Sequence, residues 1–179
     1  MLDAKFIADL ITATRGLLGL FLIWLGLSKG EESLPLAIFI AILCWTGDFV
    51  DGSIARLDRH HRKSALGDHD LEVDLFVSIC MGAYLVGAGF VSLALGITYL
   101  IGWAALFWLF GLDHTLLMAI QAPLYLCFIL VSLCEAPNPG FWILVWILMA
   151  TTILWRRFSS EVVPEFIKGM QSLGHHRRH

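Results

Sequence analysis

The stretch LFVSICMGAYLVGAGFVSLALGITYLIGWAALFWLFGL, residues 75–112, contains no charged residue. A transmembrane helix needs about 20 predominantly apolar residues, so this stretch is too long for one membrane crossing and too short for three. We therefore expect two crossings separated by a turn. The best candidate for that turn is Gly87-Ala88-Gly89, because closely spaced glycines favour a turn over a continuous helix.

The composition of the whole chain also indicates a membrane protein. Of the 179 residues, 58% are hydrophobic and only 15% are charged, whereas soluble domains are about half apolar and about a quarter charged. A globule of this size cannot bury such an excess of apolar side chains. The first apolar stretch is too long for a cleaved signal peptide and contains Asp9 and Arg15, so we interpret it as a retained span.

The rest of the chain divides into further charge-poor stretches, which predict an all-α integral membrane fold of six transmembrane helices. The predicted spans lie near residues 6–28, 35–55, 72–89, 91–111, 115–134 and 139–156. Residues 1–157 would form a single catalytic domain. Residues 158–179 would form a short cytoplasmic tail, amphipathic and basic, that can lie on the membrane surface. Pro123, inside the fifth span, predicts a kink.

Lysine and arginine set the predicted orientation, because basic residues are enriched in cytoplasmic loops. With six spans and both termini on one side, that side holds eleven basic residues, and the other side holds only Lys29. The eleven are Lys5, Arg15, Arg56, Arg59, Arg62, Lys63, Arg156, Arg157, Lys168, Arg177 and Arg178. We therefore expect a protein of the plasma (inner) membrane with cytoplasmic termini and a basic cytoplasmic loop after the second span.

An acidic motif, Asp48-Phe-Val-Asp51-Gly52-Ser-Ile-Ala55-Arg56, lies at the cytoplasmic end of the second span. Asp48, Asp51 and Ala55 follow helical spacing and share one helix face. Glycine at position 52 costs about 1 kcal/mol of helix propensity, but its missing side chain allows a ligand to approach closely. Arg56 carries a permanent charge and a forked set of donors that suits phosphate.

A second acidic pair, Asp70 and Asp74, is spaced by one helical turn at the start of the third span. If the second and third helices are neighbours, four carboxylates converge and repel one another in a partly desolvated site. Two Mg²⁺ or Mn²⁺ ions would neutralise them, and oxygen ligands favour such hard cations. Paired ions can clamp a phosphate. The alternative is ordinary solvated charges at helix ends, which we favour for Asp58, Asp68 and Glu72.

These residues resemble the signature of the CDP-alcohol phosphotransferases, Asp-x-x-Asp-Gly-x-x-Ala-Arg followed by a spacer, Gly and Asp-x-x-x-Asp. Residues 48–56 match its first half in full. The sequence Asp9-Leu-Ile-Thr12-Ala-Thr-Arg15 is similar to the Asn-x-Leu-Thr-x-x-Arg that often opens these enzymes, with Asp9 in place of asparagine. The resemblance covers about residues 8–78.

The second half of the signature departs from the family pattern. One extra residue lies between Arg56 and Asp70, and Gly67 stands closer to Asp70 than the family glycine does. Asp70 and Asp74 keep the family spacing. Leu75 follows the last aspartate, where many members have lysine or arginine.

The resemblance implies a role for each matching residue. Asp48, Asp51 and Asp70 would bind two Mg²⁺ or Mn²⁺ ions, and Asp74 would act as a ligand, as the catalytic base, or as both. Nucleotide or phosphate binding would fall to Gly52, Ala55, Arg56, Gly67, Thr12 and Arg15. Arg156 and Arg157, which end the sixth span, would bind an acceptor phosphate or serve only as a positive-inside anchor. Arg15 could instead neutralise Asp48 or extend its charge to the membrane surface.

The reaction implied by the resemblance is displacement of CMP from a CDP-linked alcohol, with CDP-diacylglycerol the best candidate, by an acceptor alcohol in phospholipid synthesis. The partners would be that CDP-linked substrate, membrane lipids and a second copy of the chain in a homodimer, with no nucleic acid. Two alternatives stay open. The acidic residues could line the path of a divalent-cation transporter or channel, or the altered spacer could mark a family member that binds its ligands without turnover.

Overall fold

The computed structural model describes residues 4–57, 70–111 and 114–157, and these are helical except for short turns. The side chains at positions 4, 5, 8, 51–57, 70, 71, 114, 154, 156 and 157 lie outside the described part. Six α-helices and one 3-10 turn fall in the described ranges: α1 (Ala4–Lys29), η1 (Gly30–Ser33), α2 (Leu34–Leu57), α3 (Asp70–Gly87), α4 (Leu93–Phe110), α5 (His114–Glu135) and α6 (Pro137–Arg157). The prediction of an all-α fold is confirmed for this part of the chain.

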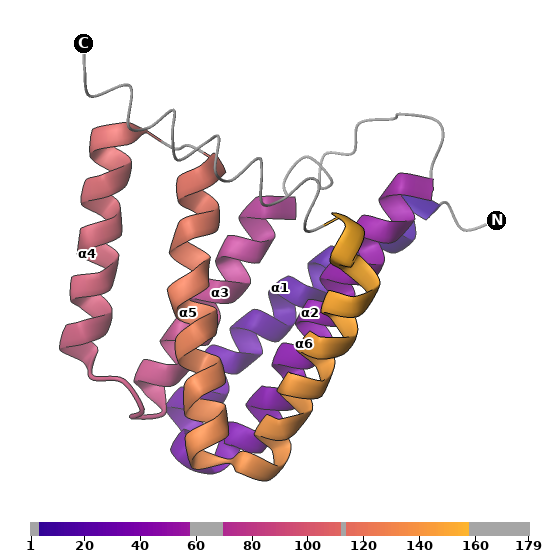
Figure 1. The fold of residues 1–179 in the computed structure, drawn as a ribbon. Coiled ribbons are helices and arrows are strands. Elements are labelled where there is room, and N and C mark those ends of the chain that lie inside the picture. The colour runs from indigo at the N-terminus through magenta and orange to yellow at the C-terminus, as the bar shows by residue number, and fades with distance from the viewer. Residues whose placement is uncertain (1–3, 58–69, 112–113, 158–179) are drawn as a thin grey trace.

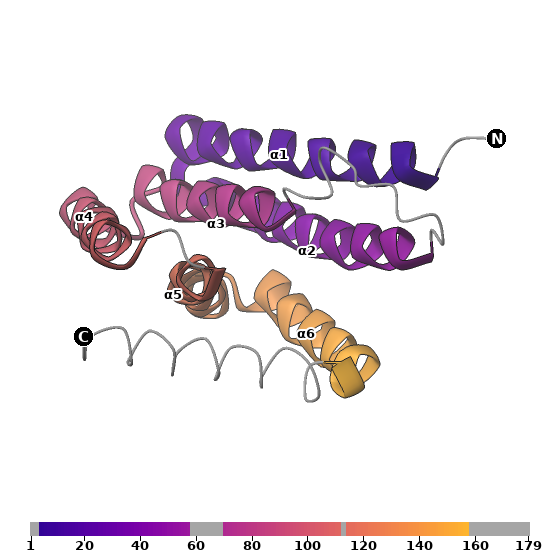
Figure 2. The same cartoon turned by 90° about the horizontal axis from the view of Figure 1, so that it is seen from above.

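Three helical segments are long and apolar enough to cross a membrane: Asp9–Val50, Leu93–Phe110 and Thr115–Glu135. The first of them covers most of α1, all of η1 and most of α2, and its chain doubles back at Gly30, where φ is +60°. Glycine adopts such a positive φ without the steric cost that a Cβ would add. Because α1 and α2 pack against each other, this segment folds as a helical hairpin (Figures 1 and 2).

The predicted turn between the third and fourth helices is confirmed. α3 ends at Gly87, and Gly89 has a φ of +90°, which suits glycine. α4 then begins after Ser92, whose side-chain oxygen accepts a hydrogen bond from the backbone N–H of Leu95 at 3.3 Å. This N-cap satisfies one of the donors that a helix start leaves open. α5 continues through Pro123 as a single helix.

α3 lies between α1 on one side and α5 on the other, with α2 beside it (Figure 2). α1 makes its most extensive contacts with α2 and α3, α5 packs on α3, and α6 packs against α5 and α2. The core lies among these five helices and includes Leu22, Ile38, Met81, Tyr84 and Phe128. α4 stands at the edge beside α3, and none of its residues is buried (Figure 1). Its exposed face is strongly apolar.

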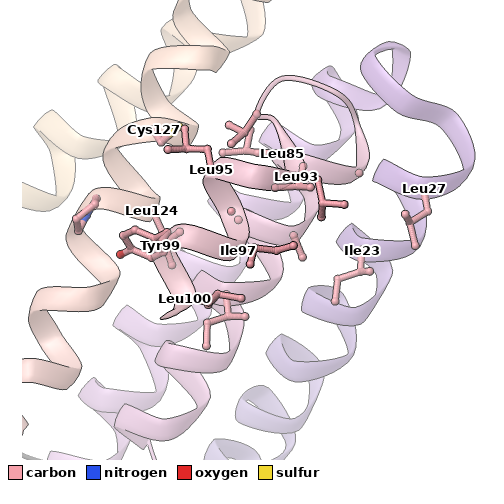
Figure 3. Close-up of a pocket in the computed structure, with 18 residues that line it drawn as sticks. Ile23, Leu27, Leu85, Leu93, Leu95, Ile97, Tyr99, Leu100, Leu124 and Cys127 are labelled. Atoms are coloured by element: carbon pink, nitrogen blue, oxygen red, sulfur yellow. The ribbon is translucent and has the colours of Figure 1, made fainter. Parts of the chain in front are cut away.

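An apolar cavity of about 480 Å³ lies between α4 and the helices α1, α3 and α5 (Figure 3). Its walls include Ile23, Leu27, Leu100 and Leu124. Tyr99 also lines it, and the hydroxyl of Tyr99 donates a hydrogen bond to the backbone oxygen of Ile120. The residues that α3 contributes belong to its second half, so the cavity is separated along α3 from the acidic residues of the first turns.

Candidate functional site

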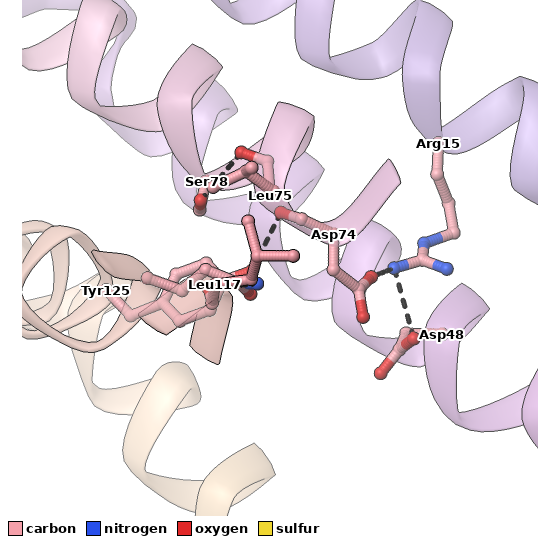
Figure 4. A network of polar contacts seen from close by, with 8 residues as sticks. Arg15, Asp48, Asp74, Leu75, Ser78, Leu117 and Tyr125 are labelled. Carbon is pink, nitrogen blue, oxygen red and sulfur yellow. Dashed lines mark hydrogen bonds and ion pairs between the residues drawn. The ribbon is translucent and has the colours of Figure 1, made fainter. Parts of the chain in front are cut away.

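A buried arginine joins carboxylates from two helices at one end of the bundle. Arg15 of α1 is 3% exposed, and its Nη2 lies 3.1 Å from the Oδ1 of Asp48 on α2. The same Nη2 donates a hydrogen bond to the Oδ1 of Asp74 on α3. Figure 4 shows one guanidinium nitrogen of Arg15 joined to both acids by dashed lines. The first and last aspartates of the predicted motif therefore meet at one cationic group, although α2 and α3 contact each other only weakly.

The arrangement follows from the packing of α1. Both α2 and α3 lie against this helix, so Arg15, on the side of α1 that is buried between them, can reach an acid on each. Thr12 lies one helical turn earlier on α1 and is also buried, at 6% exposed. A buried charge is costly unless it is paired, and the ion pairs with Asp48 and Asp74 supply that compensation.

Gly47 provides the space that the stem of Arg15 occupies. A Cβ at position 47 would lie 3.0 Å from the Cδ and 3.1 Å from the Cγ of Arg15, and 3.3 Å from the Cγ2 of Ile11. These separations are tighter than ordinary van der Waals contact, so any larger residue would push against the arginine stem. Gly47 directly precedes Asp48, and its role could not be predicted from the sequence because the contact is between two helices.

α5 closes the site on the side of Asp74. The hydroxyl of Tyr125 lies 3.4 Å from the backbone oxygen of Asp74 and 3.5 Å from the Oε1 of Gln121, within hydrogen-bonding distance of both. Gln121 is buried, and its Nε2 donates to the backbone oxygen of Leu117 at 3.0 Å. Neither Tyr125 nor Gln121 was a predicted site residue. The sequence does carry a signal for Gln121, because a polar amide inside an apolar span is uncommon and often functional.

Aromatic side chains connect α2, α5 and α6 beside Asp48. The ring of Trp45 packs edge-on against Tyr125, with centroids 5.7 Å apart, and contacts the ring of Trp146 at 5.5 Å. The indole N–H of Trp146 donates to the hydroxyl of Thr46 at 3.0 Å. Edge-to-face pairs of this kind stabilise packing beyond their buried area. Packed aromatic rings therefore join α2, α5 and α6 next to Asp48.

Several predicted site residues lie where only the backbone, or nothing, is described. α2 continues to Leu57, so Asp51, Gly52, Ala55 and Arg56 are helical, but their side chains lie outside the described part. The same holds for Asp70, the first residue of α3, and for Arg156 and Arg157 at the end of α6. Gly67 and the predicted tail of residues 158–179 lie outside the described residues.

The described side chains include no group of three or more potential metal ligands. The side chains of two of the four predicted ligands, Asp48 and Asp74, are described, and they are 43% and 23% exposed. They offer only oxygen donors, which suits Mg²⁺ or Mn²⁺. A cationic group already lies between them. The donor chemistry of these two acids therefore suits a hard divalent cation, and the guanidinium of Arg15 occupies the position next to their oxygens.

No protein-family model, curated protein or solved structure matches the chain. The function is therefore inferred from the residues of the site and their geometry.

Proposed function

We propose that this chain is a metal-dependent CDP-alcohol phosphotransferase of the membrane. The observation that carries the proposal is the convergence of Asp48 and Asp74 on Arg15. These three residues come from the three separate parts of the sequence pattern, and they lie in three different helices.

The metal ions would be held by Asp48, Asp51 and Asp70, with Asp74 completing the site. When bound, they supply positive charge that stabilises the phosphate oxygens during displacement. Asp74 would take the proton from the acceptor hydroxyl, a role that suits a partly exposed carboxylate held in a fixed position. As the new bond from the acceptor oxygen to phosphorus forms, the bond from phosphorus to the CMP oxygen breaks, and CMP leaves with that electron pair.

Other residues would bind the substrates. Gly52 and Ala55 would leave room for the cytidine nucleotide, and Arg56 would bind its phosphates. Arg156 and Arg157 would bind a phosphate on the acceptor. In-line displacement at phosphorus depends mainly on positioning and electrostatics, so a site built between packed helices suits it. We also propose that the enzyme acts as a homodimer.

The experiment that tests this function measures CMP release by the purified protein from CDP-diacylglycerol, with a series of acceptor alcohols. We expect release in the presence of Mg²⁺ or Mn²⁺, none in the presence of a chelator, and none from Asp51→Asn. Flux of divalent cations into liposomes without CMP release would instead identify a transporter. Metal-dependent binding of CDP without product would identify a member that has lost turnover.

We further propose that α1 to α6 all cross the membrane, with both termini and the loop after α2 in the cytoplasm. The strong excess of lysine and arginine on that side supports this orientation. The hairpin formed by α1 and α2 supports two crossings within the first apolar segment. In this topology the aspartates lie where the bilayer meets the cytoplasm, which suits a reaction between a lipid and a soluble nucleotide product.

This topology can be tested by cysteine labelling of intact cells. All four cysteines, which lie in the described helices, are free thiols, so each is first replaced by alanine. We expect Glu31→Cys, in η1, to react with a membrane-impermeant maleimide added outside, and His60→Cys to react only after permeabilisation. The cysteine-free protein is the control for background labelling. Reaction of both positions from the same side would contradict the six-span topology.

A further inference from the structure

Arg15 is packed along its stem and paired at one end of its guanidinium. Its stem lies in the space left by Gly47, and its guanidinium is fixed by Asp48 and Asp74. One nitrogen of the positively charged guanidinium, Nη2, contacts an oxygen of each carboxylate. Since guanidinium does not lose its proton in proteins, this charge is permanent.

We propose that Arg15 is an internal counter-ion which a divalent cation must displace from Asp48 and Asp74 before the site can work. The proposal rests on the proposed function and deepens it, because it assigns a resting state to the same site. Without metal, Arg15 keeps the two acids together and compensated. With metal, the acids become ligands and the guanidinium moves away from at least one of them.

Two physical effects make Arg15 and the metal compete. Mg²⁺ requires ligand oxygens at about 2.1 Å in near-ideal octahedral geometry, and the Oδ1 of each acid already contacts Nη2, through an ion pair with Asp48 and a hydrogen bond with Asp74. The second effect is charge, since a guanidinium a few ångströms from a divalent cation repels it, and the low dielectric of a buried site strengthens this repulsion. Both effects predict that removing the charge of Arg15 strengthens metal binding.

A supporting role for Arg15 predicts the opposite change in metal affinity. If Arg15 served to orient Asp48 and Asp74 as metal ligands, its removal would let the two carboxylates separate, and metal binding would weaken. The direction of the change in affinity therefore decides between a competing counter-ion and a supporting one.

The experiment is a titration of the purified full-length protein with Mn²⁺, in which the electron paramagnetic resonance signal reports free metal. We expect Arg15→Gln to bind Mn²⁺ about tenfold more tightly than the wild type, because it removes a neighbouring like charge. The matched control is Lys29→Gln, which removes the same charge from the far end of α1 and should leave the affinity unchanged. In the same samples, Mn²⁺ should raise the melting temperature of Arg15→Gln more than that of the wild type.

If Arg15→Gln does not fold, the same Mn²⁺ titration is made with Arg15→Lys. Lysine keeps the positive charge but lacks the planar set of guanidinium donors, so it pairs less strongly with the two acids. We therefore expect Arg15→Lys to bind Mn²⁺ more tightly than the wild type, by a smaller factor than Arg15→Gln. Unchanged or weaker binding in the folded variants would overturn the counter-ion and leave the proposed function intact. Absence of Mn²⁺ binding in the wild type and in every variant would overturn both.

Discussion

Asp74→Asn is expected to lower the rate of CMP release by about 10³-fold, the usual contribution of a positioned general base. Asparagine has nearly the same shape, and its side-chain oxygen can still accept the hydrogen bond from Arg15. It cannot take a proton from the acceptor hydroxyl and is a poor metal ligand. The protein should therefore fold normally while the chemical step fails. The measurement is CMP release under saturating CDP-diacylglycerol and Mn²⁺.

Glu72→Gln is the matched control for that variant. It makes the same change of acid to amide on the same helix, two residues earlier, at an exposed position. We expect near-normal CMP release from Glu72→Gln. If the two variants lost activity equally, the effect would reflect general charge near α3, and the assignment of Asp74 as the base would be wrong.

Gly26→Leu is expected to destabilise the folded protein by about 3 kcal/mol or more, at the upper end of the usual cost of overpacking. A Cβ at position 26 would lie 2.8 Å from the backbone oxygen and 3.1 Å from the Cα of Tyr84. Backbone cannot move aside as a side chain does, so α1 and α3 would have to separate. Small residues at helix contacts allow this close approach in membrane proteins. Thermal unfolding in detergent, followed by tryptophan fluorescence, measures the loss.

The same variant should also weaken the site, because α1 and α3 carry Arg15 and Asp74. Gly102→Leu in α4 is its control, since a Cβ there meets nothing within 4 Å. We expect Gly102→Leu to keep the wild-type melting temperature and CMP release. Equal stability of the two leucine variants would show that the close contact of α1 with α3 is not required.

The sequence predicted the helices well because their signal is local. Charge-poor stretches of the right length predicted every described helix to within a few residues, and the paired glycines at positions 87 and 89 predicted the turn before α4. The break between α1 and α2 at Gly30 also lies where charged residues interrupt the apolar pattern. Hydropathy and turn chemistry act over short distances, so a single sequence carries them.

The site was harder to predict because its contacts join residues far apart in the chain. The sequence analysis considered Arg15 as a partner that neutralises Asp48, and the ion pair between them confirms this. The spacing of the motif does not show that Asp74 contacts the same guanidinium. Gly47 has a role only because the stem of Arg15 passes beside it. Tyr125 reaches Asp74 only through the packing of α5 on α3. The metal ions, the membrane topology, the acceptor and the homodimer remain predictions.

The central claim is that carboxylates from α2 and α3 together hold divalent cations. Anomalous scattering from crystals of the protein soaked in Mn²⁺ tests it most directly. We predict manganese peaks between the two helices, about 2.1 Å from carboxylate oxygens that include those of Asp48 and Asp74, with the guanidinium of Arg15 moved away from at least one of them. Well-ordered crystals with no manganese between α2 and α3, and with Arg15 still bridging the two acids, would contradict the account.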